Sequence, residues 1–313
     1  MAVDPDGDLE PSLLHRRVDV GEVTLHVVEA GPAGAPLVVL LHGFPEFWWS
    51  WRHQIHALSA AGYHVVAPDL RGFHLSDQPR AVESYRVERL EADIAGLIHA
   101  FGAESAAVIG HDWGGALAWT FAHHYSRMVD RLGILNVPHP QRLRRGLRTF
   151  AQLRKSWYFF FFQLPRLPER WLSRGDFAVL RRRFVEDGLP AADAERFVEA
   201  ARRSDRLRGG VNYYRASWRG WARKRTRRRT CIEAPTLVIW GEKDRYLGKE
   251  LAVPDARLVP NARVEFLPAA SHWVQQDAPE RVNELLLDLL SDPVVDRTAA
   301  RDEAGASSPP RVG

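Results

Sequence analysis

The chain of 313 residues is 45% hydrophobic and 26% charged with a formal net charge of +4, which is ordinary for a soluble protein able to bury a full core in one domain, with or without an insertion. Its single cysteine, Cys231, excludes an intrachain disulfide and fits a reducing compartment. The first residues are acidic and polar, unlike a secretory signal, and no apolar run approaches the ~18 residues of a membrane span, so we expect a cytoplasmic protein without a membrane span.

Short apolar runs alternate with helical patterns along the first part of the chain. Continuous runs such as Leu37–Leu41 are typical of strands that are buried on both faces of a parallel sheet. The alternation of strand and helix therefore predicts an α/β fold, with a mainly parallel sheet and helices on both faces. We expect strands at 23–28, 37–41, 64–67, 105–109 and 132–135, and helices at 51–60, 87–101 and 114–125.

The alternation stops at Val137-Pro138-His139-Pro140, and the following segment is helix-like, aromatic and rich in arginine. Residues 138–230 hold 25 Lys and Arg against 8 Asp and Glu, whereas the rest of the chain holds 18 against 31. Such a basic segment, densest at 223–229, can bind nucleic acid, an anionic membrane or an acidic ligand. We favour a solvated face of an inserted helical cap and expect no nucleic-acid partner.

Buried-strand patterns return at 235–241 and 263–267, and a last helix follows. Asp277, with Pro279 and Glu280 behind it, predicts the N-cap and capping box of this helix. Its buried stripe is expected at positions 282, 285, 286 and 289. The sequence then becomes polar and rich in Pro, Ala and Ser, which is typical of disorder. We predict a sheet-containing core in two parts, 1–137 and 231–290, a helical cap at 138–230, and a disordered tail at 291–313.

The stretch Gly110-His111-Asp112-Trp113-Gly114-Gly115 lies between an expected strand and an expected helix. This is the context of the G-x-S-x-G nucleophile elbow, with Asp112 in the position of the serine. An aspartate is already an anion and needs no base before it attacks, and the amides that open the next helix favour its charge. A carboxylate suits displacement at a saturated carbon, which gives an alkyl ester that water must hydrolyse. The alternative is an aspartate that only caps the helix.

Two further polar segments follow strands in the second half of the chain. Gly241-Glu242-Lys243-Asp244 contains the candidate acid, and Ser271-His272-Trp273 contains the candidate base. The order of nucleophile, acid and histidine is that of the α/β-hydrolases. His272 would activate a water, and Asp244 would hold its tautomer, with Glu242 as the rival for this role. A histidine in a loop can also be purely structural.

Together with His42-Gly43-Phe44-Pro45-Glu46, which matches an HGxP motif, these segments resemble the epoxide hydrolases of the α/β-hydrolase superfamily, with similarity from about 18 to 290. The resemblance implies an oxyanion hole built from the backbone N–H groups of Phe44 and Trp113. It also implies that two cap tyrosines, Tyr158 and Tyr214, hydrogen-bond the epoxide oxygen. A phenol remains protonated at neutral pH and can donate to the alkoxide that ring opening creates.

Tyr213 is a rival of Tyr214 for this role, and aromatic packing of the cap is the alternative reading of all these tyrosines. For the substrate itself, the resemblance suggests contacts with Phe44, Trp113 and Trp273. The aromatic cap favours an apolar or aryl-bearing epoxide, while its arginines leave open an anionic one such as a fatty-acid epoxide.

The resemblance thus implies an enzyme that converts a small-molecule epoxide and water to a vicinal diol, without a metal or an organic cofactor. The sequence leaves the oligomeric state open, with a homodimer as one expectation. Two other functions stay open. A haloalkane dehalogenase would use the same nucleophile, although Phe44 stands where those enzymes often have Asn. A ligand-binding homologue would keep the pocket without turnover.

Overall fold

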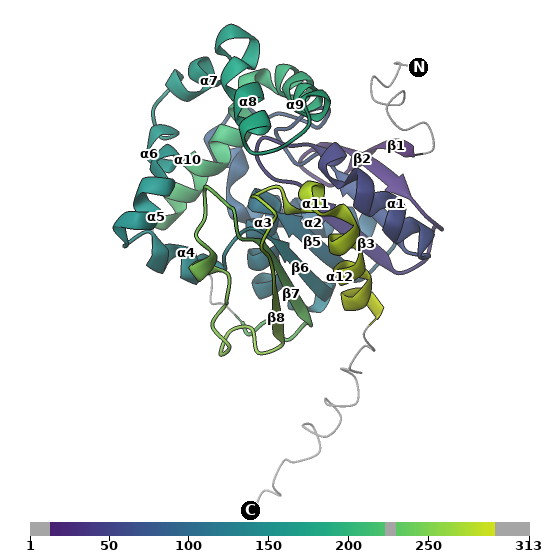
Figure 1. Cartoon of the computed structure of the whole chain (residues 1–313). Coiled ribbons are helices and arrows are strands. Elements are labelled where there is room, and N and C mark those ends of the chain that lie inside the picture. Colours follow the sequence, from purple (N-terminus) through teal and green to yellow (C-terminus); the bar gives the residue numbers. More distant parts are fainter. Residues whose placement is uncertain (1–12, 223–229, 292–313) are drawn as a thin grey trace, which may run out of the picture.

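The computed structural model describes residues 13–222 and 230–291, which contain an eight-stranded sheet (Figure 1). The strand order is β1-β2-β4-β3-β5-β6-β7-β8. Strand β2 runs antiparallel to both of its neighbours, and all pairs from β4 to β8 are parallel. The predicted α/β fold with a mainly parallel sheet is confirmed. The strands are β1 (Leu14–Asp19), β2 (Thr24–Ala30), β3 (Leu37–Leu41), β4 (His64–Pro68), β5 (Ala106–His111), β6 (Val129–Leu135), β7 (Thr236–Gly241) and β8 (Ala262–Leu267).

Helices cover both faces of the sheet. On one face α1 (Arg52–Ala60) packs against α12 (Pro279–Ser291), and on the other α2 (Val87–Ala100) packs against α3 (Asp112–His124). Every residue of β3, β4, β5 and β7 is buried between these layers. Burial on both faces explains why these strands appear in the sequence as continuous apolar runs and not as alternating patterns.

The C-terminal helix differs from its prediction at the start. The short helix α11 (Val274–Asp277) comes before it, and α12 begins at Pro279, so Asp277 is not its N-cap. The carboxylate of Asp277 instead accepts the backbone N–H of Ser271 at 2.6 Å. The predicted buried stripe at 282, 285, 286 and 289 is confirmed. Among the described residues, no helix has the length and apolar character needed to cross a bilayer.

Between β6 and β7 the chain forms a group of helices that Figure 1 shows together beyond one end of the sheet, and we propose that they form the predicted cap. The ion pair between Arg52 and Asp193, 2.7 Å long, ties this group to the core. The predicted basic run at 223–229 and the tail after 291 lie outside the described residues, and the predicted domain limits stay predictions. The helices of this group are α4 (Pro140–Gly146), α5 (Phe150–Lys155), α6 (Trp157–Phe161), α7 (Leu167–Leu172), α8 (Arg174–Glu186), α9 (Ala191–Arg203) and α10 (Arg208–Ala222).

Candidate active site

Asp112 is the first residue of α3 and directly follows β5, so the predicted strand-turn-helix elbow is confirmed. Its φ of 48° lies in the left-handed region, a conformation that costs a non-glycine residue about 1 kcal/mol or more. The turn needs glycine where it passes the neighbouring strand, because a Cβ on Gly114 would overlap the carbonyl oxygen of Leu41. The tight turn holds the Asp112 carboxylate at the carboxyl end of β5 and at the start of a helix, where a negative charge is favoured.

The loop after β3 supplies a hydrogen bond to this carboxylate. The backbone N–H of Phe44 donates to Oδ1 of Asp112 at 2.9 Å, and the Phe44–Pro45 peptide bond is cis. The other oxygen, Oδ2, lies 3.6 Å from Nε2 of His272. The two carboxylate oxygens therefore have different surroundings. Trp113, the second residue predicted for an oxyanion hole, follows Asp112 in the first turn of α3.

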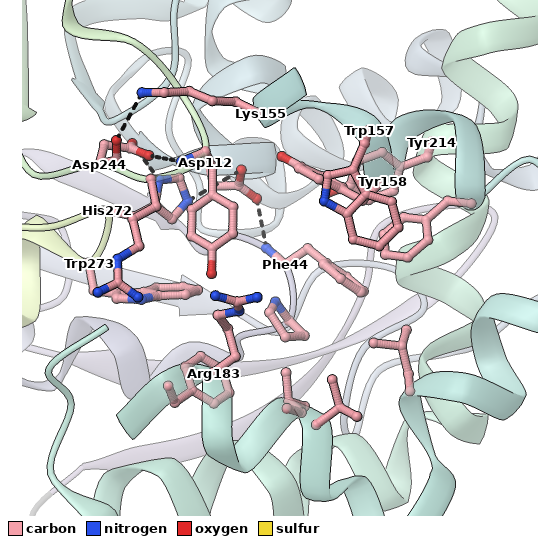
Figure 2. A pocket seen from close by; sticks show the side chains of 18 of the residues that line it. Phe44, Asp112, Lys155, Trp157, Tyr158, Arg183, Tyr214, Asp244, His272 and Trp273 are labelled. Atoms are coloured by element: carbon pink, nitrogen blue, oxygen red, sulfur yellow. Dashed lines mark hydrogen bonds and ion pairs between the residues drawn. The ribbon is translucent and has the colours of Figure 1, made fainter. Parts of the chain in front are cut away.

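His272 lies in the loop after β8, and its Nδ1 is 2.7 Å from Oδ2 of Asp244. The Asp244 carboxylate is buried and also accepts the Asn136 side-chain amide at 2.8 Å. Glu242, the rival acid in the sequence, points elsewhere and pairs with Lys249. The structure therefore brings the partly buried Asp112 and the buried His272 and Asp244 together in one row (Figure 2), and it leaves Glu242 outside this row.

Charges within this row shift its pKa values. Burial alone would raise the pKa of Asp112, but the hydrogen bond and charge of His272 and the Phe44 N–H bond lower it below the usual 3.8. Burial alone would lower the pKa of His272, but the charges of Asp244 and Asp112 outweigh burial and raise it well above 6.5. At neutral pH the free protein therefore holds a carboxylate at Asp112 beside an imidazolium at His272.

The two cap tyrosines lie across Asp112 from His272, as Figure 2 shows. Tyr158 comes from α6 and Tyr214 from α10, and their rings meet edge to face with centroids 5.9 Å apart. Burial raises the pKa of both phenols well above 10, and the negative charge of Asp112 adds to the rise in each. Both side chains are therefore hydroxyl donors at neutral pH. Tyr213 is directed away, because its hydroxyl donates to the backbone carbonyl of Arg71 at 3.0 Å.

Sequence reasoning missed a buried pair behind the nucleophile. Oε2 of Glu46 accepts the N–H of Gly43 at 2.9 Å and lies 2.7 Å from Nδ1 of His111. Nε2 of His111 lies 2.8 Å from the backbone carbonyl of His272, so this pair links the nucleophile turn to the histidine loop. Both residues flank predicted motifs, since Glu46 ends the HGxP segment and His111 precedes Asp112. Their position beside these motifs is the sequence signal from which the pair could have been predicted.

A second missed residue comes from the cap. Gln152, in α5, is buried, and its amide donates to the backbone carbonyl of Tyr246 at 2.9 Å. Its side-chain oxygen accepts the backbone N–H of Gly248 at 3.1 Å. Gln152 thus holds both sides of the loop at 244–248, which contains Asp244. No sequence motif marks it, because its partners are backbone groups far away in the chain.

Two cavities meet at the candidate nucleophile, and Asp112, Tyr158 and Tyr214 line both. The large chamber has a volume of about 600 Å³. It is lined by His272 and Asp244, and also by Phe44 and Trp273, two of the residues that were predicted to bind the substrate. The small chamber has a volume of about 140 Å³ and is lined mainly by apolar side chains. Trp113, the third predicted substrate contact, belongs to the small chamber. A substrate at Asp112 can therefore extend in two directions.

One buried cluster has the residue types of a metal site, with ligand atoms of His26, Asp69 and His74 within 4.8 Å of one another. Both imidazoles are already hydrogen-bonded to Oδ2 of Asp69, at 2.7 and 3.0 Å. Oδ1 of Asp69 accepts the backbone N–H of Trp48 at 3.0 Å. In these bonds each imidazole donates the proton on Nδ1 to the Asp69 carboxylate, so the cluster is explained by its own hydrogen bonding.

Comparisons with known proteins agree with the fold. The chain matches the family model described as alpha/beta hydrolase fold over residues 36–279. It is 41% identical over 280 residues to the AB hydrolase superfamily protein YfhM of Bacillus subtilis, a match that covers 88% of this chain and 97% of that protein. It is 38% identical over 297 residues to Epoxide hydrolase 4 of Mus musculus, with coverage of 90% and 81%.

Solved structures of epoxide hydrolases also superpose on this chain. A Bacillus megaterium epoxide hydrolase in complex with an inhibitor superposes with a TM-score of 0.81 at 33% identity, covering 88% of this chain and 99% of that one. A variant of an epoxide hydrolase from the same organism has been solved with a naphthyloxy-propane-diol product.

Proposed function

The chain belongs to the epoxide hydrolases of the α/β-hydrolase fold, and from this membership we propose that it converts an epoxide to a vicinal diol through a covalent ester on Asp112. The observation that carries the proposal is the position of Asp112 between a histidine and two protonated phenols. An ionised nucleophile on one side and hydroxyl donors on the other suit the opening of a strained C–O bond.

In the first half-reaction, Oδ2 of Asp112 attacks a ring carbon. Oδ1 is the less available oxygen because the Phe44 N–H already holds it at 2.9 Å. The new C–O bond forms while the ring C–O bond breaks, and its electron pair goes to the ring oxygen. Tyr158 and Tyr214 donate hydrogen bonds to that oxygen, which takes up a proton and becomes the first hydroxyl of the diol.

Esterification removes the negative charge of Asp112, which is one cause of the raised pKa of His272. The pKa of His272 therefore falls once the ester has formed, and the imidazolium can release a proton. This released proton balances the one that the ring oxygen takes up, so the site returns to its starting charge. His272 becomes the neutral base that the second half-reaction needs.

In the second half-reaction, His272 takes a proton from water while the water oxygen attacks the carbonyl carbon of the Asp112 ester. Oδ1 becomes the oxyanion, and the backbone N–H groups of Phe44 and Trp113 stabilise it, at about 3 kcal/mol for each well-placed donor. The ester C–O bond then breaks, and the second proton of the attacking water passes to the departing oxygen, so the diol leaves neutral and Asp112 is again a carboxylate. Asp244 stabilises the imidazolium of His272 through their 2.7 Å contact.

The experiment that tests this route is a single turnover in water enriched in heavy oxygen. We expect the label to enter the Asp112 carboxylate, and His272→Ala to accumulate a hydroxyalkyl ester that mass spectrometry detects on the intact chain. Asp112→Asn is the control that can form no such ester by direct attack. Transfer of all label to the diol in the first turnover would reject the covalent route.

The substrate proposed is an apolar or aryl-bearing epoxide, in line with the aromatic walls of both chambers. The haloalkane dehalogenase alternative predicts halide release from bromoalkanes, and the ligand-binding alternative predicts affinity without turnover. A cytoplasmic location and a homodimer stay predictions.

A further inference from the structure

The two chambers differ in charge as well as in size. Arg154, Lys155, Arg183 and Arg245 all line the large chamber. Among the described residues that line the small chamber, Asp112 is the one charged side chain. The catalytic carboxylate thus lies between an apolar chamber and a chamber with a cationic rim.

Two of the four cationic side chains already have partners within the protein. Arg245 pairs with the carboxylate of Asp187 at 3.2 Å. Lys155 donates to the backbone carbonyl of Asp244 at 3.3 Å, on the loop that contains the candidate acid. We therefore do not assign either of these side chains to the binding of an additional ligand.

The other two cations are available. The side chain of Arg154 makes no ion pair or hydrogen bond within the described part of the chain, and it is exposed at the chamber rim. Arg183 reaches into the chamber from α8, as Figure 2 shows, and its one ion pair there is a 3.5 Å contact with Glu186 along the same helix. An exposed helical pair of this kind contributes little and yields readily to a better partner.

The acidic groups that line the chamber do not compensate these cations. Of the described residues that line the large chamber, only Asp112 and Asp244 are acidic, and both are engaged with His272. The rim therefore favours an anion in the chamber.

We propose that the large chamber binds the carboxylate, or another anionic group, of an amphiphilic epoxide, and that Arg154 and Arg183 form this subsite. The inference rests on the proposed epoxide hydrolysis. The epoxide ring then lies on Asp112 below the two phenols, the anionic arm runs toward the cationic rim, and the apolar arm enters the small chamber. The preferred substrate class is an epoxide with substituents on both ring carbons, one of them apolar and the other ending in an anion.

The test compares two epoxides that differ only at the remote end of one arm, a carboxylate in one and a primary amide of the same length in the other. We expect kcat/KM to be about tenfold higher for the carboxylate at low ionic strength, as two charge-assisted contacts at a partly exposed rim would give. The preference should shrink as salt shortens the Debye length. In the double variant Arg154→Gln/Arg183→Gln the ratio should fall to within about twofold of one.

The matched control is Arg148→Gln/Arg182→Gln, which removes the same charge from two exposed cap arginines that line neither chamber. This control should keep the wild-type ratio. Because the amide substrate is measured in every variant, general damage to the enzyme cancels in the ratio. A wild-type ratio near one, or an equal fall of the ratio in both double variants, would overturn the subsite.

Failure of the underlying chemistry gives a different result. If neither epoxide is turned over and no ester forms on Asp112, the proposed hydrolysis fails. Calorimetry with the two corresponding diols then still decides the subsite. Tighter binding of the carboxylate diol, lost in Arg154→Gln/Arg183→Gln, supports it, and equal affinities reject it.

Discussion

Replacing Asp244 by asparagine keeps the size of the side chain and turns one carboxylate oxygen into a donor. Oδ1 of Asp244 accepts the backbone N–H groups of Tyr246 and Leu247 at 2.7 and 2.9 Å. Oδ2 lies 2.8 Å from the amide of Asn136 and 2.7 Å from Nδ1 of His272. All four partners donate to the carboxylate, so the new NH₂ group meets at least one donor in either orientation.

The side-chain amide of the new asparagine can take two orientations, and the more stable one leaves His272 unable to act as a base. With its NH₂ group in place of Oδ1, Asn would face two backbone donors, at a cost of about 1–3 kcal/mol for each group left unsatisfied. With NH₂ in place of Oδ2, only Asn136 conflicts, provided that His272 accepts through Nδ1 and carries its proton on Nε2. In this tautomer His272 cannot take a proton from the attacking water. Hydrolysis of the ester should fall about 10⁴-fold, or ~5 kcal/mol, whereas attack by Asp112 needs no base and should fall less than about tenfold.

Rapid-quench mixing with a styrene-type epoxide, followed by mass spectrometry of the intact chain, separates these two steps. We expect Asp244→Asn to accumulate close to one ester per chain while diol release becomes slow. Glu242→Gln is the matched control, since Glu242 lies two residues earlier and pairs with Lys249, and both rates should stay within about twofold of wild type. Ester accumulation in the Glu242 variant but not in the Asp244 variant would assign the acid role to Glu242 and refute the reasoning.

Three further outcomes can be measured independently. Tyr214→Phe should slow ester formation about tenfold or more by removing a donor to the ring oxygen, whereas Tyr213→Phe, the matched loss of a neighbouring hydroxyl, should lower the melting temperature and leave this rate unchanged. Asp112→Asn should lower the pKa of His272 in an NMR titration, because removing a negative neighbour disfavours the imidazolium; an unchanged or higher pKa would contradict the charge coupling. Gln152→Met should cost about 1–3 kcal/mol of stability and slow ester hydrolysis more than ester formation, and equal slowing of both steps would mean that Gln152 serves stability alone.

The sheet and the polar motifs at its edge could be predicted because their signals are local. A strand that is buried on both faces is a continuous apolar run, and β3 begins and ends where its run does, at Leu37 and Leu41. Asp112 and Asp244 each follow such a run directly or within a few residues, so their meeting at one sheet edge follows from parallel pairing.

Features set by contacts between distant segments could not be predicted in this way. Strand β1 was missed because it is an edge strand with mostly exposed side chains, which leaves no apolar pattern. Asp277 has the sequence context of an N-cap, but the preceding loop uses its carboxylate for the N–H of Ser271. The entry of Arg183 into the large chamber likewise depends on where the fold places α8, and the sequence shows it only as one of three consecutive arginines.

One negative charge organises the whole proposed cycle. Burial opposes the charge on Asp112, and the structure offsets this cost with the contact and positive charge of His272 and with one backbone hydrogen bond. The first half-reaction removes that negative charge. The pKa of His272, which as a cation had stabilised the nucleophile, therefore falls. The same His272 can then act as a base without any movement of the chain, and release of the diol restores both charges. The pKa of His272 is raised in the free protein although burial alone would lower it, so the shift comes from the two neighbouring carboxylates and is partly reversed when one of them is esterified.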